Sequence, residues 1–342
     1  MPVDRYVAAV ARELDVRSAG QRCWTLDTLY LGGGTPSRLG GAGVASLVAA
    51  VRARTTLEPD AEVTVEANPD DVTPAAVAAW AAAGVNRVSL GVQSFSDPAL
   101  EWMRRAHDAR AALAAIATLR EGGITNLSID LIFALPDDVP RSWRGDVDTI
   151  VALKPDHVSL YGLTVEHRTP LGRWTARGES REATEERYEA EFLYAHEAMS
   201  AAGLNHYEVS NFGRPDRHSR HNSAYWTGVP YEGLGPSAHA FDGTDRRWNV
   251  SPYAEWLTRV EAGADPVAGF ETLTEENRVA ERVYLGLRTA CGLALDAGED
   301  ERVAPWVAAG WGTVIDGHLR LTPAGWLRLD TLAATLTGWR SH

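Results

Sequence analysis

The chain has 342 residues, of which 46 are acidic and 33 are basic, so its formal net charge at pH 7 is -13. This balance argues against long-range attraction to nucleic acid or to an anionic membrane surface. Apolar residues make up 45% of the chain, as in a globular protein with a sizeable core. No apolar run approaches the roughly 18 residues of a membrane span, and the N-terminus lacks a secretory pattern, so we expect a cytoplasmic protein.

The first predicted element is an amphipathic helix over residues 3–16, which precedes the first detectable strand. Short β-rich apolar runs then alternate with helical stretches, which indicates successive βαβ units with parallel strands. Because each run is nearly apolar on both faces, the sheet should be covered by helices or closed into a barrel. Because this series opens with a helix, we expect that a strand before it has been lost. The predicted strands are 28–33, 62–68, 87–93, 127–133 and 157–163.

Helix ends are readable between these strands. Thr73 with Pro74, and Asp97 with Pro98, each place a cap residue before a first-turn proline. Gly84 follows one of the helices at the position where a left-handed residue is favoured. We therefore predict that Thr73 and Asp97 cap helices.

Polar residues interrupt the apolar strands near their carboxyl ends, where a parallel barrel places its binding site. The glycines of LGGGTPS let a backbone approach a ligand and expose amide groups, which suits a zwitterion, although a tight turn explains them equally well. Each carboxylate or amide could bind a ligand, or could bond to a neighbouring side chain or to the backbone. Arg105, expected in the helix after Gln93, has either a carboxylate partner or a surface ion pair. The polar and glycine residues near the carboxyl ends of the predicted strands are Gly33, Gly34, Thr35, Glu66, Asn68, Gln93, Ser94 and Asp130.

An acidic helical stretch over 182–202 is followed by a segment that we expect to be rich in loops. It contains RHSRHNSAYW, in which His218 and His221 lie beside Tyr225 and Trp226. Imidazole can ligate haem iron while aromatic rings pack on the porphyrin plane. The alternative is that these histidines are merely solvated or hydrogen-bonded.

The C-terminal part is predicted to be helical from Glu275 and to end in a hairpin whose turn lies at Asp316 and Gly317. Helices followed by a hairpin indicate a small winged-helix-like domain. The two cysteines, Cys23 and Cys291, are separated by most of the chain, so we expect two buried or unreactive thiols.

Nine motifs in order resemble the coproporphyrinogen-III-oxidase-like branch of the radical S-adenosylmethionine (SAM) enzymes. They are GGGTPS, VEANP, GVQSF, RRAH, IDLIFALP, LYGLTVE, HYEVSNF, HNSAYW and GLGPSAH. Within that branch, HNSAYW matches the H-N-x-x-Y-W motif of the HemW-type haem chaperones. The likeness covers essentially the whole chain.

The resemblance implies an α/β fold: a partial (β/α) barrel of the radical SAM type with a small C-terminal winged-helix-like domain. We place the barrel at 1–165, a family-specific segment that completes the core at 166–270, and the winged-helix-like domain at 271–342. The implied function is a haem chaperone that binds haem and SAM and delivers haem to acceptor proteins, among them respiratory enzymes. The sequence indicates neither nucleic-acid binding nor membrane insertion, and it does not predict an oligomeric state.

Carried over residue by residue, the resemblance also implies two sets of ligand contacts. His221 would be the candidate haem contact and metal-binding residue, and Asn222, Tyr225 and Trp226 would be further contacts of the cofactor. The implied SAM contacts are Gly33, Gly34, Thr35, Glu66, Gln93, Arg105, Asp130 and Thr164.

One departure from the family is clear. Family members hold a four-iron four-sulfur (4Fe-4S) cluster with a C-x-x-x-C-x-x-C motif after their first strand, and this chain lacks the motif. We interpret the chain as N-terminally truncated, and we expect no radical chemistry from it as it stands. An oxygen-independent coproporphyrinogen-III oxidase of porphyrin biosynthesis is the alternative function, and a non-radical barrel or inert remnant is the third.

Overall fold

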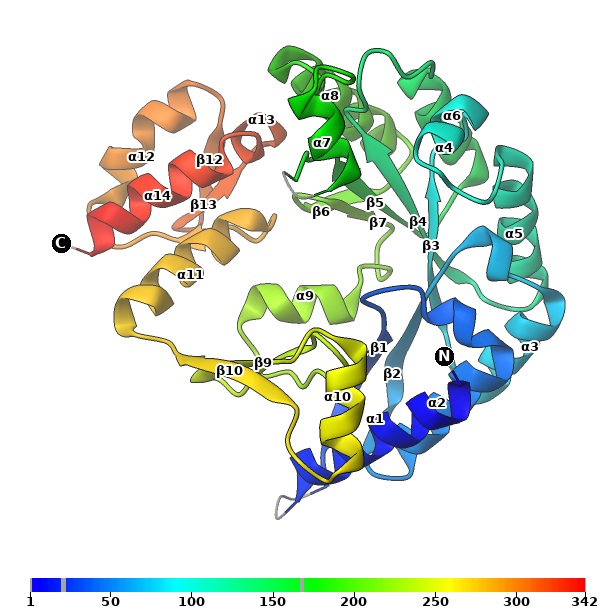
Figure 1. Cartoon of the computed structure of the whole chain (residues 1–342). Helices are drawn as coiled ribbons and strands as arrows, with labels where there is room; N and C mark the ends of the chain where they lie inside the picture. Colours follow the sequence, from blue (N-terminus) through cyan, green and yellow to red (C-terminus); the bar gives the residue numbers. More distant parts are fainter. Residues whose placement is uncertain (1, 20–22, 167–168, 342) are drawn as a thin grey trace. The chain divides into compact units, whose positions relative to one another are not determined.

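The structure is a computed structural model that describes residues 2–19, 23–166 and 169–341 (Figure 1). The chain forms two compact units, each assembled from segments that are far apart in the sequence. The first takes in the described residues of 1–88, 118–125 and 220–279, and the second those of 89–117, 126–219 and 280–342. The division at 165 and 270 stays a prediction.

The main sheet has seven strands in the order β1-β2-β3-β4-β5-β7-β6. Strands β1 and β2 are parallel, as are β4 and β5, whereas β7 pairs antiparallel with both β5 and β6. The five predicted strands are confirmed, although the first ends at Leu31 and the second begins earlier, at Thr56. The strands are β1 (Thr25–Leu31), β2 (Thr56–Ala67), β3 (Arg87–Gln93), β4 (Asn126–Phe133), β5 (His157–Gly162), β6 (Asn205–Glu208) and β7 (Asn211–Gly213).

In the first unit, helices accompany strands β1 and β2. Helix α1 contacts α2 and α10, α2 contacts α3, and α9 contacts β1 (Figure 1). Valines of α2 and β2 are buried and contribute to the core of this unit. The helices of this unit are α1 (Val3–Ser18), α2 (Gly40–Arg52), α3 (Pro74–Ala83), α9 (Arg220–Thr227) and α10 (Tyr253–Glu261). A second sheet comprises β8 (His239–Phe241), β9 (Asp245–Asn249) and β10 (Val267–Thr272).

A fully buried carboxylate links helix α1 by hydrogen bonds to the later part of the first unit. Glu13 of α1 accepts hydrogen bonds from Trp256 Nε1 at 2.8 Å, Asn249 Nδ2 at 2.6 Å and the Gly235 amide at 2.9 Å. A buried carboxylate is tolerated only when its oxygens are bonded in this way. The helix predicted over 3–16 is thus confirmed and is tied to segments more than 200 residues further along the chain.

The second unit contains the remaining strands and the C-terminal elements. A three-stranded sheet in the order β11-β13-β12 carries the predicted hairpin, and Asp316 (φ 50) and Gly317 (φ 72) form its left-handed turn. The other elements are α4 (Asp97–Trp102), α5 (Ala109–Glu121, which extends into the first unit), α6 (Trp143–Leu153), α7 (Pro170–Ala176), α8 (Glu185–Ala201), α11 (Glu275–Arg288, which begins in the first unit), β11 (Leu293–Ala294), α12 (Glu299–Ala308), β12 (Gly312–Ile315), β13 (His318–Leu321), α13 (Pro323–Trp326) and α14 (Leu329–Arg340).

One predicted helix cap is confirmed and the other is wrong. The Thr73 hydroxyl accepts from the Ala76 amide, and Gly84 is left-handed with φ 93. Asp97, by contrast, is the first residue of α4 rather than its cap, and its carboxylate accepts from the Ala109 amide at the start of the next helix. Helix α4 is short because it ends at Trp102, and Arg104 beyond it has a left-handed backbone with φ 56.

His206 of β6 is buried among aromatic rings. Its imidazole stacks on Phe212 with ring centroids 3.8 Å apart and meets the edge of Trp326 at 4.5 Å. Nε2 donates to the Val209 carbonyl at 3.2 Å, so Nδ1 accepts from His196 at 3.0 Å. Burial lowers the pKa of His206 to about 3, so the ring is neutral at physiological pH.

This burial predicts an acid-sensitive fold. In the unfolded chain, His206 is protonated below its ordinary pKa of 6.5. In the folded chain, the buried imidazole is protonated only near pH 3. The free energy of unfolding should therefore fall as pH drops from 6.5, with a contribution from His206 of up to about 1.4 kcal/mol per pH unit. Urea unfolding at pH 7, 6 and 5 should show a weaker pH dependence for His206→Phe. The exposed control His239→Phe should keep the wild-type dependence, and an unchanged slope in His206→Phe would contradict the assignment.

Candidate ligand-binding site

Alternate side chains of β1 and β2 form a polar face in the first unit. The parallel register sets Thr28 opposite Glu62 and Tyr30 opposite Thr64. Because successive side chains of a strand point to opposite faces, Thr28 and Tyr30 share one face, as do Glu62 and Glu66 on β2. Figure 1 shows α9 on one side of these strands, with α2 and α3 on the other.

The carboxylate of Glu62 fastens the start of α9 to the sheet. Its oxygens accept from the backbone amides of Arg220 at 3.1 Å and His221 at 3.0 Å. These amides belong to the first turn of the helix, where backbone donors lack helical partners and a negative charge is favoured. The Arg220 side chain adds a bond of 2.6 Å to the Asp60 carbonyl. Glu62 therefore sets both the position and the direction of α9.

His221 is held on three sides. Its Nδ1 lies 2.8 Å from the Thr28 hydroxyl, and its Nε2 lies 3.0 Å from the hydroxyl of Tyr225, one helical turn further on. The ring stacks on Tyr30 with centroids 4.8 Å apart and an interplanar angle of 15°. Burial lowers the pKa of His221 to about 4, so its imidazole is neutral at pH 7.

Glu66 lies at the end of β2, close to the glycine-rich loop. Its Oε1 accepts from the Tyr30 hydroxyl at 2.7 Å, and its Oε2 accepts from the Gly33 amide at 3.2 Å. Burial raises the pKa of Glu66, and the hydrogen bonds from Tyr30, Gly33 and Gly34 oppose that rise. Gly33 is left-handed (φ 78), and the space beside Gly33 and Gly34 is open where a larger residue would carry a side chain. Glu66 and the glycine-rich loop are therefore in direct contact.

The remaining residues of the predicted sites lie on several different elements of the chain. Thr35 precedes a short 3-10 helix and makes no capping bond. On α9, Asn222 and Trp226 are half-buried. Asp130 lies inside β4 rather than at its end, and the Ser89 and Ser128 hydroxyls donate to it at 3.0 Å and 3.3 Å.

In the second unit, Gln93 ends β3 with a left-handed backbone of φ 72, which is rare for a residue with a side chain. Thr164 is exposed. Arg105 lies after α4, not in a helix, because α4 ends at Trp102 and Arg104 takes φ 56. Burial lowers the pKa of Arg105, and the described part of the chain supplies it with no ion pair. The predicted surface ion pair of Arg105 is therefore wrong, and a carboxylate partner from a ligand stays a prediction.

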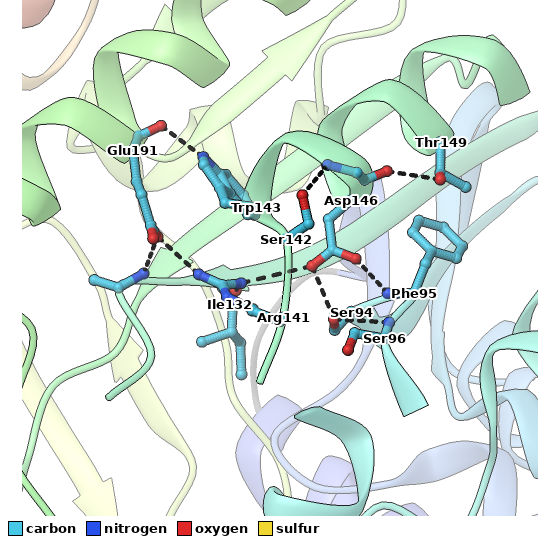
Figure 2. A network of polar contacts seen from close by, with 12 residues as sticks. Ser94, Phe95, Ser96, Ile132, Arg141, Ser142, Trp143, Asp146, Thr149 and Glu191 are labelled. Atoms are coloured by element: carbon cyan, nitrogen blue, oxygen red, sulfur yellow. Dashed lines mark hydrogen bonds and ion pairs between the residues drawn. The ribbon is translucent and has the colours of Figure 1, made fainter. Parts of the chain in front are cut away.

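A buried network fixes the loop that follows Gln93. Figure 2 shows Asp146 of α6 reaching Ser94 and Phe95, with Arg141 between Asp146 and Glu191. Asp146 accepts from the Phe95 amide at 2.7 Å and the Ser94 hydroxyl at 2.8 Å, and lies 3.6 Å from Arg141 Nη1. Arg141 also donates to Glu191 at 2.7 Å. Burial raises the pKa of Asp146 and lowers that of Arg141, so each charge depends on its partners.

Comparison with known proteins places these features in a family. Residues 7–150 match the model of the radical SAM superfamily. The chain is 42% identical to the heme chaperone HemW of Mycobacterium tuberculosis over 347 residues, which covers 98% of this chain and 87% of the relative. The HemW of Lactococcus lactis is 33% identical, covering 88% of this chain and 78% of its own. The chain belongs to the HemW heme chaperone family.

A solved structure agrees with the HemW fold. The coproporphyrinogen III oxidase HemN of Escherichia coli, a radical SAM enzyme, superposes with a TM-score of 0.78 over 98% of this chain and 83% of its own, at 21% identity. This likeness confirms the expected α/β partial barrel. Among the described residues of this HemW family member, no helix combines the length and apolar character that crossing a membrane requires.

The H-N-x-x-Y-W motif of this HemW family member forms helix α9, although we predicted a loop-rich segment. Sequence reasoning also missed Thr28, Tyr30 and Glu62. For Glu62 the available signal was its even spacing from Glu66 on the same strand, whereas Thr28 and Tyr30 are linked to Glu66 only through the strand register. Cys23 and Cys291 are both exposed, so their predicted burial is wrong. The described residues contain no group of three or more histidine, cysteine or acidic side chains that could hold a metal ion.

The Figure 2 network generates a stability prediction for this HemW family member. Asp146→Ala should leave Arg141 with one fewer negative partner and free the Ser94–Phe95 loop, so the free energy of unfolding should fall by about 3 kcal/mol. Urea unfolding measures the change. Asp148→Ala, an exposed position on the same helix, should change it by less than about 0.5 kcal/mol. Equal effects of the two substitutions would contradict the importance of the network.

Proposed function

We propose that this HemW family member binds haem at α9, binds SAM, and delivers haem to acceptor proteins. The observation that carries the proposal is the placement of His221. Its ring is neutral, its Nδ1 is bonded to Thr28, and its Nε2 faces the partly exposed Tyr225. Metal-binding histidines characteristically use one ring nitrogen for the metal and the other for an orienting hydrogen bond.

The residues present fit a haem group. Iron would bind at Nε2 in place of the Tyr225 hydroxyl, while Thr28 would keep hold of Nδ1. Because the imidazole stays neutral well below pH 7, a proton does not compete for the coordinating lone pair. The neighbouring Asn222, Tyr225 and Trp226 would contact the porphyrin, and their aromatic rings supply flat apolar surface.

The residues present also fit groups of SAM. Glu66 and the open backbone at Gly33 and Gly34 would accept and donate hydrogen bonds to the ligand's amino-acid or ribose groups. In the second unit, the half-buried Arg105, which has no ion pair among the described residues, would attract a carboxylate. We propose Thr35, Gln93, Asp130 and Thr164 as further contacts.

The residues present do not fit a 4Fe-4S cluster. Such clusters are held by several clustered cysteine thiolates, and Cys23 and Cys291 are the only cysteines of the chain. No radical step is therefore derived for these residues. The alternative, a coproporphyrinogen-III oxidase, has only the fold in its favour, because the likeness to HemN is at 21% identity. Respiratory enzymes as acceptors and a cytoplasmic location remain predictions.

A haem titration tests the proposal. The wild-type chain should develop a Soret band on addition of haem. His221→Ala should weaken binding by at least about 10–100-fold, because that range applies when only a group that supports a metal ligand is lost. His239→Ala is the matched control, because His239 is exposed in the same unit and should bind like the wild type. An absent Soret band, or equal haem affinity in both variants, would contradict the proposed site.

A further inference from the structure

We propose that Tyr30 couples the SAM site to the haem site, so that a ligand bound at Glu66 strengthens haem binding at His221. This inference rests on the proposed function. Tyr30 makes both contacts itself: its hydroxyl donates to Glu66 Oε1 at 2.7 Å, and its ring stacks on His221. A single side chain of β1 therefore joins the proposed SAM carboxylate to the proposed iron ligand.

The contact between Tyr30 and Glu66 needs a glycine beside it. A Cβ atom at Gly32 would overlap Tyr30 Cε1 and would lie 2.7 Å from Glu66 Oε1. Gly32 thus leaves room for the phenol to reach the carboxylate. Gly32 does not have a left-handed backbone in this structure. A glycine is therefore needed there because a side chain would not fit, and not because of the backbone conformation.

The direction of the coupling follows from which contacts must break. In this structure, His221 Nε2 lies within hydrogen-bonding distance of the Tyr225 hydroxyl, and the Tyr30 stack helps to hold the ring there. Haem iron can reach Nε2 only when that arrangement opens. A ligand hydroxyl or ammonium group that binds Glu66 competes with the Tyr30 hydroxyl for Oε1, which loosens the stack. The cost of opening falls, so haem affinity rises.

Linkage makes this coupling reciprocal: haem must strengthen binding at Glu66 by the same factor. Coupling between sites in proteins typically amounts to about 5–150-fold. We expect a value near the lower end, about fivefold, because Thr28 continues to hold His221 after Tyr30 is displaced.

The test compares haem affinity, measured by Soret titration, with and without saturating S-adenosylhomocysteine. The wild type should bind haem about fivefold more tightly with the probe present. Tyr30→Phe keeps the ring but removes the bond to Glu66, so the ratio should fall to about one, and Gly32→Ala should have the same effect. Tyr253→Phe is the matched control, since it removes a buried hydroxyl that has no hydrogen-bond partner among the described residues and should keep the wild-type ratio.

A second readout needs no haem. In protein labelled with ¹⁵N-histidine, the probe should shift the ring signals of His221 in the wild type and leave them in place in Tyr30→Phe. A protein that binds both ligands with a ratio of one, or a Tyr30→Phe variant that keeps the wild-type ratio, would overturn the coupling and leave the proposed function standing. Failure of the wild type to bind haem or the probe would overturn both.

Discussion

The Glu62 carboxylate, which accepts from two backbone amides at the start of α9, is the contact on which the proposed haem site depends. Glu62 is 5% exposed, and its two carboxylate oxygens accept hydrogen bonds from the backbone amides of Arg220 and His221. A buried carboxylate is stable only if such donors are present, and the first turn of a helix supplies donors that need an acceptor. The Glu62 carboxylate thus receives the donors that it needs, and the first-turn amides of α9 receive an acceptor. The helix is thereby fixed with His221 against Thr28 and Tyr30.

The same strand pair also shapes the proposed SAM site. Thr28 and Tyr30 of β1, with Glu62 and Glu66 of β2, alternate along one face, so the residues that orient His221 lie beside those that would bind the adenosyl ligand. A rigid parallel pair places functional groups more precisely than loops do. Tyr30 contributes to both sets, and this explains why two ligands could influence each other without a large rearrangement of the first unit.

Much of the fold was predictable from the sequence because local patterns and tertiary packing agree there. The apolar strands, helix α1, the Thr73 cap and the Asp316–Gly317 turn all follow from periodicity or from backbone preferences. The contact of Glu66 with the glycine loop is also consistent with the sequence pattern, since Glu66 lies near the carboxyl end of β2 and the loop follows the neighbouring strand β1.

The remainder depends on contacts that no local pattern reports. Helix α9 contains few apolar residues in helical order, and Glu62, which caps it, lies 159 residues before His221. The predicted helix through Arg105 is wrong because α4 ends at Trp102 and Arg104 has a left-handed backbone, which the local sequence pattern does not indicate. Thr28 and Tyr30 lie in a strand that is otherwise largely apolar, so the sequence does not mark them as site residues. Only the register between β1 and β2 shows that they share a face with Glu66.

Hydrogen exchange at the Arg220 and His221 amides, combined with haem affinity, tests the role of Glu62 most directly. Both amides should be protected in the wild type and should exchange faster in Glu62→Ala, which should also bind haem about tenfold more weakly although His221 is intact. Glu58→Ala, on the same strand, should behave like the wild type. Unprotected amides in the wild type, or full haem affinity in Glu62→Ala, would contradict the account.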